Sequence, residues 1–256
     1  MKIYRFLLDG RTMYGVLRED RLHVVRGSVF EDFEVGEEAV PLGRVRLLPP
    51  CEPSKIVAVG VNYRDHARER GKEPPREPLL FLKPSSALIG TGDVILHPRM
   101  SERVDFEGEL ALVIRRRARH VGAEEDVGPY ILGLTCFNDV TARDLQDKDV
   151  QFTRAKSFDT FAAAGPCIAV GLSSDGLDIK TFLNGKLRQS SNTRNLIFTV
   201  PELVRVISRV MTLLPGDIVT TGTPSGVGPM RPGDRVDVQV EGIGTLSNTV
   251  AMDEPS

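Results

Sequence analysis

The first 47 residues alternate apolar and polar positions in short runs that are separated by polar turn residues. Three runs, Lys2–Leu7, Tyr14–Arg18 and Leu22–Val25, have the two-residue period of a half-buried strand. Asp9-Gly10 and Glu19-Asp20 separate these runs, and such pairs favour the tight turns of β-hairpins. The pattern predicts a small antiparallel β-meander at the N-terminus.

Residues 48–53, Leu-Pro-Pro-Cys-Glu-Pro, interrupt this pattern with three prolines. Proline lacks a backbone donor and fixes φ, so this segment continues neither a helix nor a central strand. We therefore predict two domains. Residues 1–50 form a small N-terminal β-domain, and residues 51–256 form a larger catalytic domain whose first strand begins near Lys55.

Strand patterns dominate the rest of the chain. One helix is expected after Thr199, because Thr199-x-x-Glu202 is a capping box and apolar residues follow it at helical spacing. Shorter helices are expected at residues 63–70 and 141–148. The predicted strands are Ile56–Gly60, Leu79–Lys83, Val94–Leu96, Glu109–Ile114, Tyr130–Phe137, Pro166–Val170, a hairpin over Asp178–Ser190, Asp217–Thr221, Arg235–Val240 and Gly244–Val250. Because strands and helices do not alternate, the chain is predicted to be α+β and mostly β, a mixed β-roll or sandwich.

Composition narrows the class of protein. The 256 residues carry a net charge of −2 and are 41% apolar and 27% charged, which is typical of a globular domain. Acids and bases are interleaved, so no nucleic-acid partner is expected. No apolar stretch reaches the length of a membrane span and the N-terminus lacks signal-peptide features, so a cytoplasmic location is expected. The odd number and wide spacing of the cysteines favour reduced core residues over disulfides or a zinc site: Cys51, Cys136 and Cys167.

Carboxylates stand at the ends of two predicted strands. Glu107 and Glu109 lead into the apolar run that ends at Ile114, and alternate strand residues share a face. Asp139 follows the next apolar run. Three acids placed together repel one another unless a cation lies between them. Mg²⁺ or Mn²⁺ takes about six oxygen ligands, so about three coordination positions would stay open for water or a chelating substrate. For Glu107 and Glu109 alone, a solvated strand face is the alternative.

His66 and Glu69 lie three residues apart in a predicted helix, so they share one face. A carboxylate orients a neighbouring imidazole, which is how a general base that activates water is commonly supported. The alternative is an exposed pair of little consequence. Thr221-Gly222-Thr223-Pro224 follows an apolar strand, where glycine lets backbone amides approach a ligand, although an ordinary turn would have the same composition.

Six segments, in this order, resemble the fumarylacetoacetate hydrolase family. That family includes acylpyruvases, oxaloacetate decarboxylases and homoprotocatechuate-pathway isomerase/decarboxylases. The resemblance covers roughly residues 55–250. The segments are Gly-Val-Asn-Tyr-Arg-Asp-His-Ala-Arg-Glu (60–69), Phe-Leu-Lys-Pro (81–84), Asp-Phe-Glu-Gly-Glu-Leu-Ala (105–111), Asn-Asp-Val-Thr-Ala-Arg-Asp-Leu-Gln (138–146), Arg-Ala-Lys-Ser-Phe-Asp-Thr-Phe (154–161) and Thr-Gly-Thr-Pro-Ser-Gly-Val-Gly (221–228).

The resemblance implies a fold of the same family, a homodimer and roles for single residues. His66 and Glu69 match the family's catalytic pair, and Lys156 matches the lysine that stabilises negative charge beside the metal. The family's magnesium ligands match Glu107, Glu109 and Asp139. The positions where the family contacts substrate oxygens match Lys83, Gln146 and Thr223.

Two further expectations follow from the motif around His66. The catalytic pair lies on a lid in the family, and residues 65–78 of this chain are polar with interspersed glycine and proline, so this segment is expected to be mobile without substrate. The enzyme that names the family has a fourth carboxylate ligand upstream of its histidine, whereas residues 58–62 contain none. The chain therefore resembles the smaller members, and a small 2-oxo acid is the expected substrate.

The predicted function is hydrolysis of a C–C bond in 2,4-dioxo acids of the acylpyruvate type by a Mg²⁺- or Mn²⁺-dependent enzyme. The metal and Lys156 would stabilise the enolate, and His66 with Glu69 would deliver water. Oxaloacetate decarboxylation and isomerisation or decarboxylation of 2-hydroxyhepta-2,4-diene-1,7-dioate are alternatives on the same site. A non-catalytic, metal-dependent 2-oxo-acid binding protein is the alternative of another class, and the retained His66, Glu69 and Lys156 argue against it.

Overall fold

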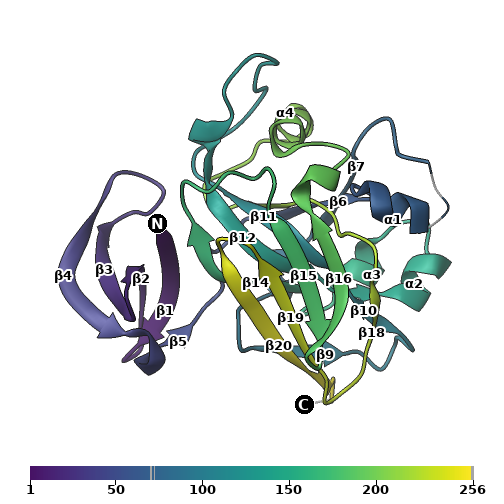
Figure 1. The fold of residues 1–256 in the computed structure, drawn as a ribbon, viewed down its shortest axis with the longest axis horizontal. Coiled ribbons are helices and arrows are strands. Elements are labelled where there is room, and N and C mark those ends of the chain that lie inside the picture. Colours follow the sequence, from purple (N-terminus) through teal and green to yellow (C-terminus); the bar gives the residue numbers. More distant parts are fainter. Residues whose placement is uncertain (70, 72, 255–256) are drawn as a thin grey trace.

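The computed structural model describes residues 1–69, 71 and 73–254. An antiparallel meander occupies the N-terminus and stands at one side of Figure 1: β1 (Lys2–Leu8), β2 (Arg11–Arg18), β3 (Arg21–Gly27) and β4 (Phe33–Pro41). Positive φ angles at Asp9, Gly10 and Glu19 form the two predicted hairpin turns. The sequence pattern did not predict β4, because three glutamates and Gly36 obscure its alternation and none of its residues is fully buried.

One 12-stranded sheet runs through the molecule in the order β4-β3-β2-β1-β14-β12-β11-β17-β6-β7, with β5 beside β1 and β8 beside β14. Its further strands are β5 (Arg46–Leu47), β6 (Ile56–Gly60), β7 (Leu79–Lys83), β8 (Leu88–Ile89), β11 (Gly108–Ile114), β12 (Ile131–Asp139), β14 (Ala162–Ala169) and β17 (Ile218–Thr220). The meander joins the rest where Lys2 and Ile3 pair with Ala169 and Ile168. The proposed boundary near residue 50 therefore crosses a continuous sheet.

The other strands of the described part of the chain form two smaller sheets. The five-stranded sheet has the order β16-β15-β19-β20-β9, with β9 (Val94–His97), β15 (Asp178–Leu183), β16 (Lys186–Asn192), β19 (Arg235–Val240) and β20 (Gly244–Met252). The three-stranded sheet joins β10 (Val104–Phe106), β13 (Thr141–Ala142) and β18 (Gly228–Met230). The five-stranded sheet packs on β11, β12 and β14, which gives the mostly β, mixed-sheet sandwich that the pattern predicted.

Packing on both faces explains why β11 and β14 are buried along their whole length. Alternate residues of β11 enter different parts of the core. Leu110 and Leu112 belong to the cluster that includes Val238 of β19, whereas Ala111 and Val113 pack in a second cluster. The buried central strands β11 and β12 thus carry Glu109 and Asp139 near their ends.

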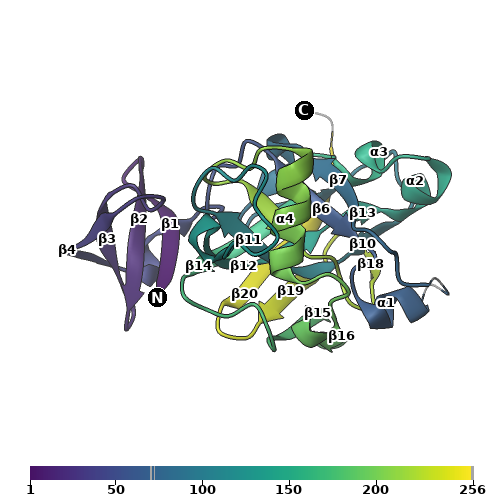
Figure 2. The same cartoon turned by 90° about the horizontal axis from the view of Figure 1, so that it is seen from above.

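Within the described residues, four α-helices lie outside the sheets: α1 (Arg64–Glu69), α2 (Arg143–Lys148), α3 (Thr153–Lys156) and α4 (Val200–Val210). Glu202 accepts a hydrogen bond of 2.7 Å from the Thr199 backbone N–H, so α4 begins where the capping box predicts. Figure 2 shows α1, α2 and α3 gathered at the end of the molecule away from the meander. Short 3₁₀ turns occur at Leu42–Arg44, Ser85–Ala87, Gly128–Tyr130 and Thr193–Asn195.

The element boundaries differ from the predictions at several points. The helix expected at 63–70 begins at Arg64, and residue 70 lies outside the described residues. Thr141 and Ala142 form β13 instead of the first turn of α2. β14 begins four residues before the predicted strand at Pro166, because its alanines give no β signal until neighbouring strands bury them. No helix among the described residues is long and apolar enough to cross a membrane.

Candidate metal centre and active site

The three predicted acidic residues meet at the ends of adjacent strands. Glu107 lies between β10 and β11, Glu109 lies in β11, and Asp139 ends β12. Gly108 pairs with Asn138, and the Asp139 N–H donates to the Glu107 carbonyl at 2.9 Å, so the antiparallel register brings the acids together. One carboxylate oxygen from each lies within 4.8 Å of the other two, and all three residues are buried.

Cationic side chains compensate two of these acids. The Lys156 ammonium donates to Glu107 at 2.9 Å and to Asp139 at 2.6 Å. Arg143 also donates to Glu107. Burial raises the pKa of Glu107, but Lys156 and Arg143 outweigh this effect and hold its pKa well below the usual range. Glu107 is therefore a carboxylate at neutral pH.

Glu109 is less well compensated, because the Lys156 charge only partly offsets its burial. It accepts a hydrogen bond of 2.9 Å from the Gly222 N–H, yet burial, followed by the charges of Asp139 and Glu107, raises its pKa well above the usual range. A divalent cation would remove this penalty, since the group offers hard oxygen donors and contains neither a histidine nor a cysteine. The residues thus fit a Mg²⁺- or Mn²⁺-type ion, which the three carboxylates would hold.

A cavity of about 280 Å³ opens over the acidic cluster. Phe81 and Phe152 form an apolar part of its wall, while His66, Gln146 and Thr223 contribute polar groups. The other residues around it include Val59, Leu79, Arg143, Asp147 and Lys156. The combination of acids, cations and an apolar wall suits a small anionic ligand with a short carbon chain.

His66 and Glu69 form the pair expected from their spacing. His66 is 5% exposed, and its Nδ1 lies 3.1 Å from a Glu69 carboxylate oxygen. The other Glu69 oxygen accepts from the Gly226 N–H at 3.0 Å, which ties α1 to the 221–228 loop. Since Nδ1 is engaged by the carboxylate, Nε2 is the nitrogen that can exchange a proton with a ligand in the cavity.

The three residues expected to bind substrate occupy different positions. Thr223 lines the cavity beside the acids, and Gln146 lies there too, accepting a hydrogen bond from Arg143. Lys83 is fully buried and donates to Asp139 and to the Val140 carbonyl. Burial lowers the pKa of Lys83 to about 8 despite the Asp139 charge. In this structure Lys83 supports a metal-binding carboxylate, and its substrate contact stays a prediction.

Arg143 and Asp105 belong to the site but were missed from the sequence. Arg143 Nε donates to Asp105 at 2.9 Å, and its other nitrogens reach Glu107 and Gln146. Asp105 is fully buried and also accepts from Arg103. Asp105 and Arg143 lie within the family motifs at 105–111 and 138–146. Their closeness in sequence to Glu107 and Asp139 could therefore have identified them as site residues. Their pairing over 38 positions became visible only in the fold.

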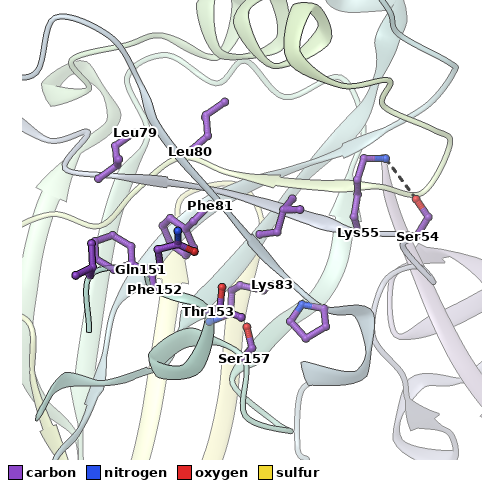
Figure 3. Close-up of a pocket in the computed structure, with 13 residues that line it drawn as sticks. Ser54, Lys55, Leu79, Leu80, Phe81, Lys83, Gln151, Phe152, Thr153 and Ser157 are labelled. Carbon is purple, nitrogen blue, oxygen red and sulfur yellow. Dashed lines mark hydrogen bonds between the residues drawn. The ribbon is translucent and has the colours of Figure 1, made fainter. Parts of the chain in front are cut away.

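A second cavity, of about 710 Å³, lies behind the wall of the first and is lined by β7 and residues 150–153 (Figure 3). Phe81 and Phe152 line both cavities, and their rings meet edge to face with centroids 5.5 Å apart. This second cavity is larger, but Glu107, Glu109, Asp139 and His66 do not line it. We therefore place the candidate active site in the smaller cavity.

Comparison with known protein families agrees with this geometry. The model described as "Fumarylacetoacetate (FAA) hydrolase C-terminal" matches residues 55–251, and "Rv2993c-like, N-terminal" matches residues 1–50. The chain belongs to the fumarylacetoacetate hydrolase family. The matched region contains every residue of the acidic cluster and of the cavity wall, so the family assignment applies to the part of the chain that carries the site.

Relatives of this family cover nearly the whole chain. An uncharacterised protein of Archaeoglobus fulgidus is 54% identical over 245 residues, which are 96% of this chain and 94% of that protein. The oxaloacetate tautomerase YisK of Bacillus subtilis is 42% identical over 233 residues, which are 85% of this chain and 77% of that enzyme.

Solved structures show the same fold. 5-Carboxymethyl-2-hydroxymuconate delta-isomerase from Mycobacterium smegmatis has a TM-score of 0.93 at 40% identity, covering 99% of this chain and all of that one. Maleylpyruvate hydrolase from Sphingobium, solved with manganese and pyruvate, has a TM-score of 0.82 at 30% identity with the same coverage. The family therefore includes tautomerase, isomerase and hydrolase members on this scaffold.

Proposed function

We propose that the protein is a divalent-metal-dependent enzyme that acts on small 2-oxo acids, with keto–enol tautomerisation of oxaloacetate as its first candidate reaction. The observation that carries this proposal is a buried cluster of three carboxylates in which Glu109 is incompletely compensated, beside the Lys156 ammonium and under a cavity of about 280 Å³. The likeness to the oxaloacetate tautomerase of Bacillus subtilis supports the choice of substrate.

Glu107, Glu109 and Asp139 would hold Mg²⁺ or Mn²⁺, and the ion would polarise the carboxylate and 2-oxo group of a chelating substrate, which acidifies its C3–H bond. Lys156 is 2% exposed and remains charged, because Asp139 and Glu107 outweigh the effect of burial and raise its pKa. A fixed positive charge in a buried site stabilises the negative charge that develops on the substrate oxygen. Arg143 donates to the other carboxylate oxygen of Glu107 and helps to hold it in place.

His66 is the proposed base. Its Nε2 would take the proton from C3 while Glu69 orients the ring and stabilises the imidazolium. The C3–H electron pair then forms a C2=C3 double bond, the carbonyl π pair moves to the 2-oxo oxygen, and return of the proton to that oxygen completes the keto-to-enol tautomerisation. The C3–H bond is the only σ bond to carbon that breaks. Gln146 and Thr223 line the cavity and would orient the remaining oxygens of the substrate.

Hydrolysis of acylpyruvate-type 2,4-dioxo acids is the second candidate. The same His66–Glu69 pair can take a proton from water, whose oxygen would then attack the 4-oxo carbon and release pyruvate and a carboxylic acid. The likeness to maleylpyruvate hydrolase favours this reading. Oxaloacetate decarboxylation and isomerisation of 2-hydroxyhepta-2,4-diene-1,7-dioate place similar demands on Lys156 and are the remaining alternatives.

A substrate panel tests the proposal. Enol and keto oxaloacetate, two acylpyruvates and a hydroxymuconate-type dienol are incubated with enzyme and Mg²⁺ or Mn²⁺, and ¹H NMR follows each species. We expect rapid enol–keto exchange of oxaloacetate that chelation abolishes. Faster cleavage of an acylpyruvate would favour the hydrolase. If the protein binds these acids but converts none of them, it is a non-catalytic binding protein and the proposal is overturned.

The two-domain division at residues 50 and 51 and the homodimer are also proposals. The separate family models for residues 1–50 and 55–251 support the division. The dimer rests on the family resemblance and has its own test below.

A further inference from the structure

A buried glutamine outside the cavity wall is fully engaged beside the acidic cluster. Gln189 lies in β16 and is 0% exposed. Its Oε1 accepts from the Gly108 N–H at 2.9 Å, while its Nε2 donates to Thr223 Oγ1 and to the Pro224 carbonyl, each at 2.8 Å. One acceptor and both donors of the amide are therefore used.

A further hydrogen bond closes these contacts into a ring of hydrogen bonds. The Thr223 hydroxyl donates to the Gly108 carbonyl at 2.9 Å, so Gly108, Gln189 and Thr223 are each bonded to the other two. The orientation of the amide follows from chemistry, since the Gly108 N–H can only donate and the Pro224 carbonyl can only accept. No side chain of another type has this pattern of one acceptor and two donors at the same length.

The position of Gly108 gives the ring its significance. Gly108 joins Glu107 to Glu109, two of the three clustered acids. A Cβ atom at Gly108 would lie 2.1 Å from Thr181 Oγ1 and 3.1 Å from Gln189 Oε1, so the five-stranded sheet approaches this backbone as closely as a glycine permits. β16 thus holds both the peptide between the acids and the loop that presents Thr223 to the cavity.

We propose that Gln189 is a positioning residue that fixes the spacing of Glu107 and Glu109 for the metal and the place of Thr223 for the substrate. This inference rests on the proposed function, because it assumes that the acids bind a cation. The hydrogen bonds of Gln189 go to Gly108, Thr223 and Pro224 and not to the acids, and Gln189 does not line the cavity. It acts through Gly108 on one side and through Thr223 on the other.

The test compares Gln189→Met with Gln239→Met. Methionine is neutral and similar in length to glutamine but removes the amide. Gln239 is an exposed residue on β19 of the same sheet, so it controls for the chemical change. Isothermal titration gives the Mn²⁺ dissociation constant, and the electron paramagnetic resonance spectrum of bound Mn²⁺ reports its ligand geometry.

We expect Gln189→Met to weaken Mn²⁺ binding about 10- to 100-fold, the usual effect of losing a residue that orients metal ligands, and to alter the spectrum, while Gln239→Met leaves both unchanged. Mn²⁺ affinity within twofold of wild type would overturn the proposal, even if the melting temperature fell, because Gln189 would then serve stability alone. The binding assay needs no turnover. Wild-type protein that binds Mn²⁺ without catalysis would overturn the proposed function and leave this inference standing.

A double-mutant cycle tests whether Gln189 acts through the ring. Thr223→Val removes the hydroxyl that bonds to both Gln189 and Gly108. We expect the double variant to bind Mn²⁺ and oxalate only slightly less tightly than whichever single variant binds them less tightly. The reason is that both substitutions break the same ring of hydrogen bonds. Losses that multiply would contradict this. If Gln189→Met does not fold, unchanged Mn²⁺ and oxalate affinity in Thr223→Val would by itself overturn the proposal.

Discussion

At the residue scale, the need of the candidate site for a metal ion depends on which of its acids are paired with cationic side chains. Glu107 is hydrogen-bonded to Lys156 and Arg143, whereas Glu109 has a neutral donor in the Gly222 N–H and feels the Lys156 charge only as a smaller effect than burial and the neighbouring acids. The two acids lie two positions apart in the sequence, yet their pKa values shift in opposite directions. This asymmetry leaves one buried acid for a cation to neutralise and keeps the others in place without it.

Replacement of His66 tests the proposed base. We expect His66→Ala to lower kcat about 10²–10⁴-fold in tautomerisation and in acylpyruvate hydrolysis, the usual contribution of general-base catalysis. Oxaloacetate decarboxylation should be much less affected, because it needs chiefly the metal and the Lys156 charge. Stopped-flow absorbance and coupled assays for pyruvate measure the three rates.

His97→Ala is the matched control, because His97 lies on β9 and does not line the cavity. The His97→Ala variant should catalyse all three reactions at the wild-type rates. An equal loss on all three reactions after His66→Ala would mean that the histidine serves binding or closure, and the assignment of a base would fail.

The cysteines provide a second residue-scale prediction. All three are free and fully buried. Burial raises the pKa of Cys136 to about 12 and of Cys167 to about 11, and it raises that of Cys51 as well. Because the thiolate is the reactive form, we expect no reaction with an aromatic disulfide reagent at pH 8 until guanidinium unfolds the protein, when three thiols should react. Labelling of the native protein would contradict this.

At the scale of elements, β16 and the segment after it connect the two halves of the site. Gln189 contacts the strand that carries the acids, and Ser191, two residues along, donates to Asp65 of α1 at 2.7 Å. Arg64 donates to the Leu196 carbonyl at 2.9 Å. The helix with His66 and the strand with Glu109 are therefore positioned by the same hairpin.

The prediction for this element concerns residues 65–78, of which 70 and 72 lie outside the described residues. Residues 65–69 belong to α1, whose His66 and Ala67 are buried, whereas residues 71 and 73–78 are exposed or half-buried, so rapid amide exchange in the free enzyme is expected chiefly of the latter. Binding of oxalate with Mg²⁺ should slow this exchange, because closure over the cavity would exclude water. Hydrogen-exchange mass spectrometry measures it, with β11 as the slowly exchanging control. Equal exchange with and without oxalate would contradict the prediction.

At the scale of the whole molecule, the acidic cluster links metal binding to folding stability. A ligand that binds only the folded state at 100 times its dissociation constant stabilises by about 2.7 kcal/mol, or roughly 5–10 °C in a chain of this length. We expect Mg²⁺ or Mn²⁺ to raise the melting temperature by this amount and a chelator to reverse the effect. Differential scanning calorimetry measures the change.

Glu109→Gln is the informative variant, because glutamine resembles the protonated acid that the raised pKa indicates. The metal-free variant should melt at or above the wild-type temperature, and added metal should no longer raise it. A full metal-dependent increase in Glu109→Gln would show that the three carboxylates do not form the binding site.

The oligomeric state is the second whole-molecule prediction. The family resemblance implies a homodimer, so multi-angle light scattering at micromolar concentration should give twice the mass of one chain. The mass should not change when metal is removed, because the acidic cluster lies at strand ends inside one chain. A monomer would contradict the prediction. The cytoplasmic location is likewise still a prediction.

Local pattern and motif order determined much of this protein in advance. Two-residue alternation predicted three of the four meander strands, because a half-buried strand must alternate its side chains. Apolar strand-like runs predicted most strands of the sandwich. The capping box predicted the start of α4. The order of six motifs predicted the family, and acids at strand ends predicted the cluster of Glu107, Glu109 and Asp139 that the fold assembles.

Only the tertiary structure decided how these parts are connected. The alanines of β14 became a central strand because neighbours bury them, and β1 joined the main sheet through Ala169. The contacts of Arg143 with Asp105 and of Gln189 with Gly108 span 38 and 81 positions. Such pairs leave no local period, since they form only where burial deprives a polar group of water and another strand supplies its partner.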